Sequence, residues 1–225
     1  MRLEPHAFAL WAPEHLWVIG LTVLATTGLI LTRQRMRGWQ DLFWRRSAAA
    51  ALLVNEVGSW IWAAAHGIGR IPLQLCDLAV ILTVIALWTL GPRVSELAYF
   101  WGVTGSLQAI LTPDLRWGFP DYWWIKFFLT HCGVVLGVVY LAVTGRVRPT
   151  VGSVWRVWML TNVYAALAGL INWGCRTNYG YLAHKPMQPS LLDYLGPWPL
   201  YIAVVDVAAL GMFALAYVPF RLKRT

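Results

Sequence analysis

The fold is decided by the stretch Ile71-Pro72-Leu73-Gln74-Leu75-Cys76-Asp77-Leu78-Ala79-Val80, which continues as Ile81-Leu82-Thr83-Val84-Ile85-Ala86-Leu87-Trp88-Thr89-Leu90 to Gly91. This run is long enough to cross a bilayer, which takes about 20 apolar residues. Its first turns nevertheless carry an amide, a thiol and a carboxylate, on Gln74, Cys76 and Asp77. Polar groups in hydrocarbon are costly and normally face a protein interior or a wet cavity. The stretch therefore predicts a membrane helix with a candidate nucleophile, the Cys76 thiol, in its first turns.

The composition of the chain is that of an integral membrane protein. Of its 225 residues, 59% are hydrophobic and 12% are charged, and the mean hydropathy is +0.57. Soluble domains carry about 25% charged residues, so we expect residues 1–225 to form a single integral membrane domain. The net charge of +8 comes largely from arginines in short links between apolar runs. Membrane topology and anionic lipid explain such a pattern, and nucleic-acid binding is not expected.

Seven apolar runs are long enough to be membrane spans, each of which takes about 20 residues. They lie at about 14–32, 46–66, 72–91, 94–112, 122–144, 154–174 and 198–219. Basic residues gather in the links after the first, third and fifth runs and in the C-terminal tail, which the positive-inside rule assigns to the inside. The sequence thus predicts an all-α, polytopic helix bundle in the cell membrane, with its N-terminus outside and its C-terminus inside. A six-span alternative requires one weak run to be re-entrant.

The cysteines indicate neither a disulfide framework nor a metal site. Cys76, Cys132 and Cys175 are an odd number, and no two form a C-x-x-C pair. The first residues also lack the basic region and apolar core of a cleaved signal peptide, so we expect the first span to act as the insertion signal. The two polar links at 113–121 and 175–197 fall on the predicted outer side, where function tends to be found in connecting segments.

A thiol and an imidazole are predicted at comparable depth in two different spans. Cys76 lies about four residues into its span, roughly 6 Å deep, and His131 about nine residues into the fifth, roughly 13 Å from the same side. A thiol becomes a good nucleophile when a neighbouring base takes its proton, and histidine is the usual base. The alternative is a buried cysteine that only fills space, with a histidine in a structural hydrogen bond. Cys132 points about 100° away from His131 and is interpreted as packing.

Several other polar residues lie on the predicted outer side. Gln74 and Asp77 flank the thiol, Gln108 lies near the end of the fourth span, and Asn172 lies near the end of the sixth. Such groups can stabilise an oxyanion during acyl transfer. They can equally form hydrogen bonds between helices.

Three polar residues are predicted deeper in the bundle. Asn55 and Glu56 fall in the middle of the second span, and Asp206 falls about a third of the way down the seventh. Acidic groups at such depth indicate a polar core or a proton path. No lysine or arginine lies the same number of residues from the end of its predicted span as these acids do, so an ion pair is not expected. Protonation, or hydrogen bonds to Asn162 or to tryptophan indoles, is the expected way to satisfy them.

Several sequence blocks resemble the YwaF-type bacterial integral membrane proteins. They are Leu73-Gln74-Leu75-Cys76-Asp77, Gly105-Ser106-Leu107-Gln108-Ala109-Ile110-Leu111-Thr112-Pro113, Phe127-Phe128-Leu129-Thr130-His131-Cys132-Gly133, Asn178-Tyr179 with Lys185-Pro186, and Ser190-Leu191-Leu192-Asp193-Tyr194-Leu195-Gly196-Pro197-Trp198-Pro199. The resemblance runs from about residue 45 to the end, and its most specific part is the last two blocks. That family is grouped with the animal transmembrane protein 164, and more remotely with androgen-induced lipid hydrolases.

The animal relative is described as a cysteine-dependent acyltransferase that acts on phospholipids. The resemblance therefore implies that Cys76 and His131 are the catalytic pair, and it adds Asn178 and Tyr179 to the candidate substrate-binding residues. The resulting hypothesis is a lipid acyltransferase or acyl-ester hydrolase that needs no cofactor or metal, with a phospholipid or other acyl lipid as partner. The alternatives are a proton-coupled small-molecule transporter, and a scaffold or receptor without catalytic activity.

Overall fold

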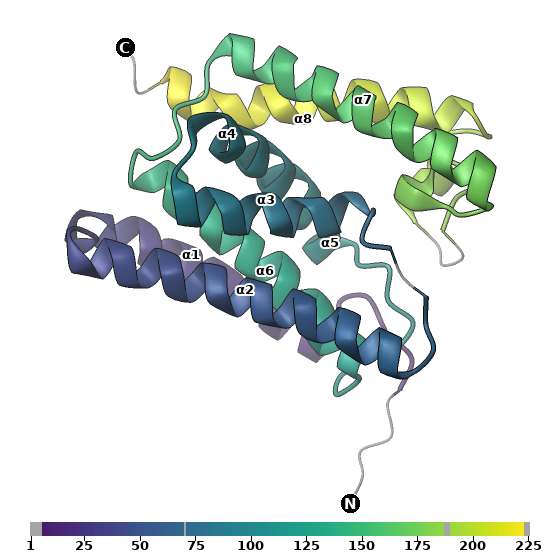
Figure 1. Cartoon of the computed structure of the whole chain (residues 1–225), viewed down its shortest axis with the longest axis horizontal. Helices are drawn as coiled ribbons and strands as arrows, with labels where there is room; N and C mark the ends of the chain where they lie inside the picture. Colours follow the sequence, from purple (N-terminus) through teal and green to yellow (C-terminus); the bar gives the residue numbers. More distant parts are fainter. Residues whose placement is uncertain (1–5, 70, 187–189, 223–225) are drawn as a thin grey trace, which may run out of the picture. The chain divides into compact units, whose positions relative to one another are not determined.

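The computed structural model describes residues 6–69, 71–186 and 190–222, and its regular elements are helical apart from one isolated bridge between Ala7 and Trp117 (Figure 1). The α-helices are α1 (Pro13–Thr32), α2 (Trp39–Ala65), α3 (Leu75–Thr89), α4 (Pro92–Trp101), α5 (Leu107–Leu111), α6 (Tyr122–Val143), α7 (Val151–Cys175) and α8 (Leu200–Arg221). Shorter turns are η1 (Arg33–Arg35), the π-helical η2 (Gly102–Ser106), η3 (Tyr179–Tyr181) and η4 (Leu191–Tyr194).

The predicted multi-pass helical fold is confirmed. Among the described residues, α2, α6, α7, α8 and the continuous stretch Pro13–Arg35 are long and apolar enough to cross a membrane. The two other predicted spans differ from simple crossings. The span predicted at 72–91 is the 15-residue helix α3, and the one at 94–112 is divided into α4, η2 and α5. The orientation of the termini stays a prediction.

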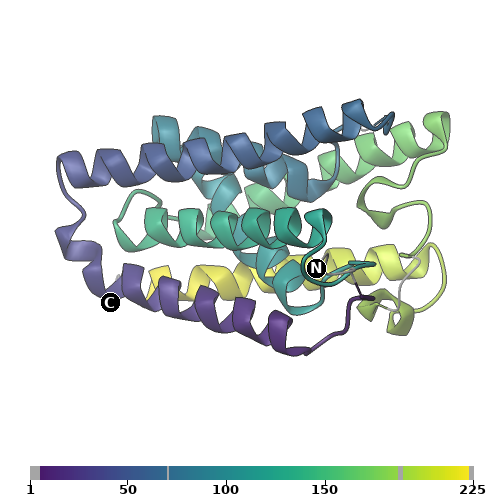
Figure 2. The same cartoon turned by 90° about the horizontal axis from the view of Figure 1, so that it is seen from below.

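The described chain divides into two compact units. Residues 6–72 and 76–147, apart from the undescribed residue 70, make up the first unit, and residues 73–75 with the described part of 148–222 make up the second. In the first unit α6 packs against α1 on one side and α2 on the other, and Figure 2 shows it lying between them. Helices α4, η2 and α5 also pack against α6. The side chains of α6 therefore form the centre of this unit.

Glycines allow the helices to approach α6 closely. A Cβ atom at Gly102 of η2 would lie 2.9 Å from Val138 and 3.0 Å from Val134 of α6. A Cβ atom at Gly137 of α6 would lie 3.0 Å from the Thr83 side chain of α3. Small residues at such crossings are the usual means of close helix packing in membranes, where tight van der Waals contact drives association.

A histidine joins the start of α1 to the end of α5. The fully buried His15 ring contacts the Ile110 carbonyl oxygen through Nε2 at 2.7 Å, and its Nδ1 accepts from the Trp11 amide at 3.2 Å. Both ring nitrogens are thus satisfied, and the Ile110 carbonyl near the C-terminus of a short helix gains a partner outside its helix.

In the second unit α7 packs along α8. An amide–carboxylate hydrogen bond joins them at 2.9 Å, from Asn162 Nδ2 to Asp206 Oδ1. Of the alternatives expected for the acids in the bundle, the hydrogen bond to Asn162 is the one that the half-buried Asp206 makes. Helix α7 begins at a capping box of Thr150 and Ser153 and ends where Arg176 adopts a left-handed conformation with φ of 54°.

Candidate functional site

His131 presents one bonded and one unbonded ring nitrogen inside the first unit. Its Nδ1 lies 2.8 Å from the carbonyl oxygen of Phe127, one turn earlier on α6. Because a carbonyl can only accept, Nδ1 carries the proton and Nε2 of the neutral ring carries the lone pair. Nε2 is buried and has no hydrogen-bond partner among the described residues, and only 4% of the residue is exposed. This is the protonation state that a general base requires.

A buried ion pair lies between α2 and α6 in the same unit. Lys126 Nζ is 2.9 Å from Glu56 Oε2, and both side chains are almost fully buried. The indole of Trp60 donates to Glu56 Oε1 at 2.9 Å, as expected for a tryptophan partner. Beside the pair, Asn55 Nδ2 donates to the hydroxyl of Thr130 at 2.8 Å.

The ion pair corrects the sequence-based expectation that no basic residue lies level with Glu56. Counting residues from the predicted span ends places Lys126 too near a helix end. Such a count ignores the stagger between α2 and α6. The Trp62 ring stacks on the Tyr122 ring with 4.9 Å between centroids, so α6 begins level with Trp62 rather than with the end of α2. Lys126, four residues into α6, then lies within reach of Glu56 through its flexible four-carbon stem.

Cys76 is half-buried in the first turn of α3, next to the buried Asp77. The charges of Glu56 and Lys126 act on both the Cys76 thiol and the His131 imidazole. The Asn55–Thr130 hydrogen bond, next in sequence to both Glu56 and His131, places the ion pair and the imidazole in the same region of the α2–α6 interface. A direct pairing between the sulfur and the imidazole stays a prediction.

Four of the candidate substrate-binding residues organise the segment after α7 in the second unit. Gln74 Oε1 accepts from the Gly180 amide at 3.0 Å. Asn172 donates to the Tyr179 carbonyl at 2.9 Å and accepts from its amide at 2.7 Å. Asn178 accepts from two successive amides of the same segment, those of Ala183 and His184. These side chains hold the backbone of residues 177–184, and any role in binding a substrate stays a prediction.

The remaining candidates have local partners. Gln108 of α5 donates through Nε2 to the Thr112 hydroxyl at 2.7 Å. Cys132 accepts a hydrogen bond from Thr22 of α1 at 3.1 Å, in keeping with its interpretation as a packing residue. All three cysteines are free, and Cys175 is exposed. Within the described ranges, no cluster of three or more His, Cys, Asp or Glu side chains could hold a metal ion.

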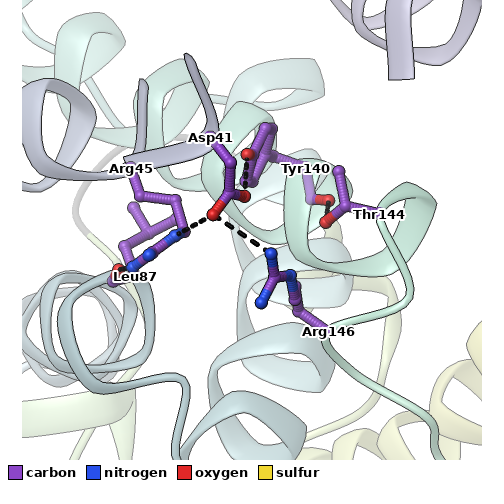
Figure 3. A network of polar contacts seen from close by, with 6 residues as sticks. All are labelled: Asp41, Arg45, Leu87, Tyr140, Thr144 and Arg146. Atoms are coloured by element: carbon purple, nitrogen blue, oxygen red, sulfur yellow. Dashed lines mark hydrogen bonds and ion pairs between the residues drawn. The ribbon is translucent and has the colours of Figure 1, made fainter. Parts of the chain in front are cut away.

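A second charge cluster surrounds the buried Asp41 near the start of α2 (Figure 3). One oxygen of Asp41 accepts from the Tyr140 hydroxyl, and the other accepts from Arg45 Nε and Arg146 Nη2, each at 3.1 Å. Arg45 also donates to the Leu87 carbonyl at 2.6 Å. That oxygen is near the end of α3, where carbonyls lack partners within the helix. Both oxygens of the carboxylate are thus occupied.

A comparison with known proteins identifies the family. The model of the TMEM164 family matches residues 10–217. The chain belongs to the TMEM164 family. A protein of Treponema pallidum (strain Nichols), described as an uncharacterized protein, is 28% identical to this TMEM164-family chain over 152 residues. The matched region covers 68% of the chain and 63% of the Treponema protein, so it spans less than two thirds of that relative. No solved structure matches the chain.

The site of this TMEM164-family chain contains one group that sequence reasoning undervalued. From the sequence, Lys126 is expected at a helix end, yet it is 7% exposed and makes the ion pair with Glu56. The available signal was its spacing: Lys126 and Thr130 are four residues apart, so both fall on the face of α6 that meets α2.

Proposed function

We propose that this TMEM164-family chain is a lipid acyltransferase of the cell membrane that uses Cys76 as nucleophile and His131 as base. The observation that carries the proposal is the state of the His131 ring. Its Nδ1 proton is bound to the Phe127 carbonyl, and its buried Nε2 has no partner among the described residues. An unpaired buried acceptor is costly and is found where it serves a function. The buried Glu56–Lys126 pair lies in the same part of the α2–α6 interface as His131, because Asn55 bonds to Thr130 beside it, and this polar surrounding supports a reactive site there.

The proposed reaction has two steps that balance in atoms and charge. The Cys76 sulfur attacks the carbonyl carbon of a lipid ester while His131 Nε2 takes the thiol proton. The bond from that carbon to the lipid alkoxy oxygen breaks, the imidazolium protonates the leaving alkoxide, and the acyl group remains on Cys76 as a thioester. A second hydroxyl then attacks the thioester while Nε2 takes its proton, and the thiol is restored. A lipid hydroxyl as acceptor gives transfer, and water gives hydrolysis.

Donors for the oxyanion belong to the same proposal. Gln108 is the candidate on the first unit, because its amide donates to the Thr112 hydroxyl and can exchange that partner for a substrate oxygen. Gln74, Asn172, Asn178 and Tyr179 hold the segment after α7 in the second unit, and their part in substrate binding is a separate element of the proposal. Asp77 lies beside the nucleophile and acts on it electrostatically.

The transporter alternative has less support. It depends on acids that can release and take up protons along a path through the bundle. Glu56 is held by Lys126 and Trp60, and Asp206 by Asn162. These partners favour a structural role for both acids.

The test is direct detection of an acyl-enzyme. The full-length protein in detergent is incubated with a phospholipid, and its intact mass is measured before and after hydroxylamine, which cleaves thioesters. We expect a hydroxylamine-sensitive acyl adduct on Cys76, lost in Cys76→Ala and formed more slowly in His131→Ala. Cys132→Ala and Cys175→Ala are the matched controls and should retain it. An adduct that survives Cys76→Ala, or none with any phospholipid tested, contradicts the proposal.

A further inference from the structure

An apolar groove of about 800 Å³ runs along the first unit between α1, α2 and α6. Small residues and bulky apolar side chains from the three helices both line it. The small residues are Ala25, Ala48, Ala51, Gly133 and Gly137. Its volume is within the range of about 300–1,000 Å³ that is usual for small-molecule sites. We call this feature the α1–α6 groove.

Two polar side chains that line the α1–α6 groove donate to neighbouring protein groups. Thr22 donates to the Cys132 sulfur at 3.1 Å, and Asn55 donates to Thr130 at 2.8 Å. All three helices that form the groove are long and apolar enough to span a membrane. Apart from the indole nitrogen of Trp124, which is unpaired among the described residues, the groove is lined mainly by apolar side chains, so it matches a hydrocarbon chain better than a polar ligand.

A basic pocket lies beyond one end of the groove, in the same unit. It encloses about 410 Å³ between the α1–α2 link and the end of α6. Its charged lining residues are Arg33, Arg37 and Arg146, and no carboxylate is among the described residues that line it. Arg146 uses one nitrogen on Asp41, and its side chain remains 39% exposed. We call this feature the arginine pocket.

The spacing of the two features matches one amphipathic molecule. The last groove residue on α6 is Gly137, and the arginine pocket includes Thr144, seven residues further along the helix. At 1.5 Å per residue the two are about 10 Å apart along the axis. This leaves room for a glycerol backbone between an acyl chain and a phosphate. The arginine-rich link also lies on the side that the positive-inside rule assigns to the cytoplasm, whose leaflet carries anionic lipid.

We propose that the α1–α6 groove and the arginine pocket together bind one anionic phospholipid of the cytoplasmic leaflet. One acyl chain lies in the groove, and the phosphate lies among Arg33, Arg37 and Arg146, whose guanidinium groups suit phosphate oxygens. His131 is not among the residues that line the groove. The lipid site is therefore separate from the proposed reaction centre and does not depend on catalysis.

The test is photo-crosslinking of the full-length protein in detergent with phosphatidylglycerol that carries a diazirine in one acyl chain. We expect adducts on peptides of α1, α2 and α6. The crosslinking yield should fall about fivefold for Arg33→Gln and about fivefold for Arg37→Gln. Each basic residue near an anionic headgroup contributes about 1 kcal/mol, which is about fivefold in affinity. Arg35→Gln is the matched control, because Arg35 belongs to the same turn but does not line the pocket.

A larger side chain in the groove tests whether the acyl chain of the lipid binds there. Ala51→Phe should abolish the adduct, whereas Ala50→Phe should not, because Ala50 is a neighbouring residue of the same helix that does not line the groove. A thermal melt identifies a variant that fails to fold, and Ala51→Leu then replaces it. As an independent readout, phosphatidylglycerol should slow maleimide labelling of Cys132, which lines the groove, and leave the exposed Cys175 unaffected.

Three results overturn this proposal. They are equal crosslinking by phosphatidylcholine and phosphatidylglycerol, displacement of the probe by inorganic phosphate alone, and adducts unchanged by Ala51→Phe in folded protein. Cys76→Ala should crosslink as well as wild type. Failure of acyl-enzyme formation and failure of lipid binding are therefore distinguishable.

Discussion

Two buried acids on α2, Asp41 and Glu56, have different surroundings. Asp41 accepts from a tyrosine and two arginines, and one of those arginines also binds the end of α3. Glu56 has one lysine and one indole, and the charge pair acts on the Cys76 thiol and on His131, whose Nε2 is unbonded among the described residues. A fully satisfied charge cluster serves to hold helices together, whereas a charge pair beside an unsatisfied base is the kind of arrangement in which chemistry occurs. Under the proposed function, the Asp41 cluster is structural and the surroundings of Glu56 and His131 are reactive.

The largest expected effect distinguishes His131 from the other buried histidine. His131→Ala should slow formation of the Cys76 acyl-enzyme by about 10²–10⁴-fold, because a positioned base contributes that much. His15→Ala should lower the free energy of unfolding by about 1–3 kcal/mol, because it leaves the Ile110 carbonyl without its side-chain partner. The rate of acylation per folded molecule should stay unchanged in His15→Ala. Equal losses of rate in the two variants would remove the distinction between them.

The next effect concerns stability at the Asp41 end. Asp41→Ala leaves Arg45 buried without its carboxylate and Arg146 without its ion pair, so we expect the free energy of unfolding to fall by about 5 kcal/mol, the upper part of the usual range. Denaturant or thermal unfolding in detergent measures it. Asp41→Asn, which keeps the shape and an acceptor oxygen, should lose less. A loss of under about 1 kcal/mol in Asp41→Ala would contradict a structural role for the cluster.

A smaller effect is expected from removing the Glu56–Lys126 pair as a whole. Lys126→Met alone should cost about 3 kcal/mol, because the Glu56 charge is left buried. The double variant Glu56→Gln/Lys126→Met should return to within about 1 kcal/mol of wild type, and a double-mutant cycle gives the coupling. If the double variant is stable but its acylation rate is altered, the pair tunes the site; an unaltered rate assigns it to packing alone.

The smallest effect is expected at an exposed pair on α4. Arg93 lies 3.7 Å from Glu96, and its side chain is 69% exposed. Surface ion pairs of this kind contribute little. Arg93→Gln should therefore melt and acylate like wild type. A clear change in either measurement would show that solvent-exposed charges matter here as much as the buried clusters do.

The spans that sequence reasoning placed well are those bounded by clear turn formers. The run predicted at 122–144 is α6, Tyr122–Val143, and the run at 14–32 is α1, Pro13–Thr32. The start of α2 was missed by seven residues, because Asp41, Arg45 and Arg46 have the composition of a loop. Asp41 and Arg45 pair with each other, but their further partners, Tyr140 and Leu87, lie far along the chain, and Arg46 packs over the Trp88 ring. Local composition contains no information about such partners.

The candidate site was predictable only in part. The Asn162 partner of Asp206 and an indole partner for Glu56 follow from the scarcity of other donors in an apolar chain, and both were expected. The Lys126 partner was not expected, because the stagger of two antiparallel helices is set by packing at Trp62 and Tyr122. The acceptor of the His131 Nδ1 proton is the carbonyl of Phe127, four residues earlier in the helix. This partner can be predicted from the spacing of residues along a helix alone.

The π-helical turn at Gly102–Ser106 controls the rotational phase of the helix that follows it. A turn of this type holds one more residue than an α-helical turn. Deleting that extra residue would rotate α5 by about 100° and shift it by about 1.5 Å. The Ile110 carbonyl would then point away from the ring of His15 that it now contacts. A residue count, rather than any particular side chain, therefore sets the alignment of α5 with α1, and the segment should tolerate substitutions at open positions such as Gly105 better than changes of length.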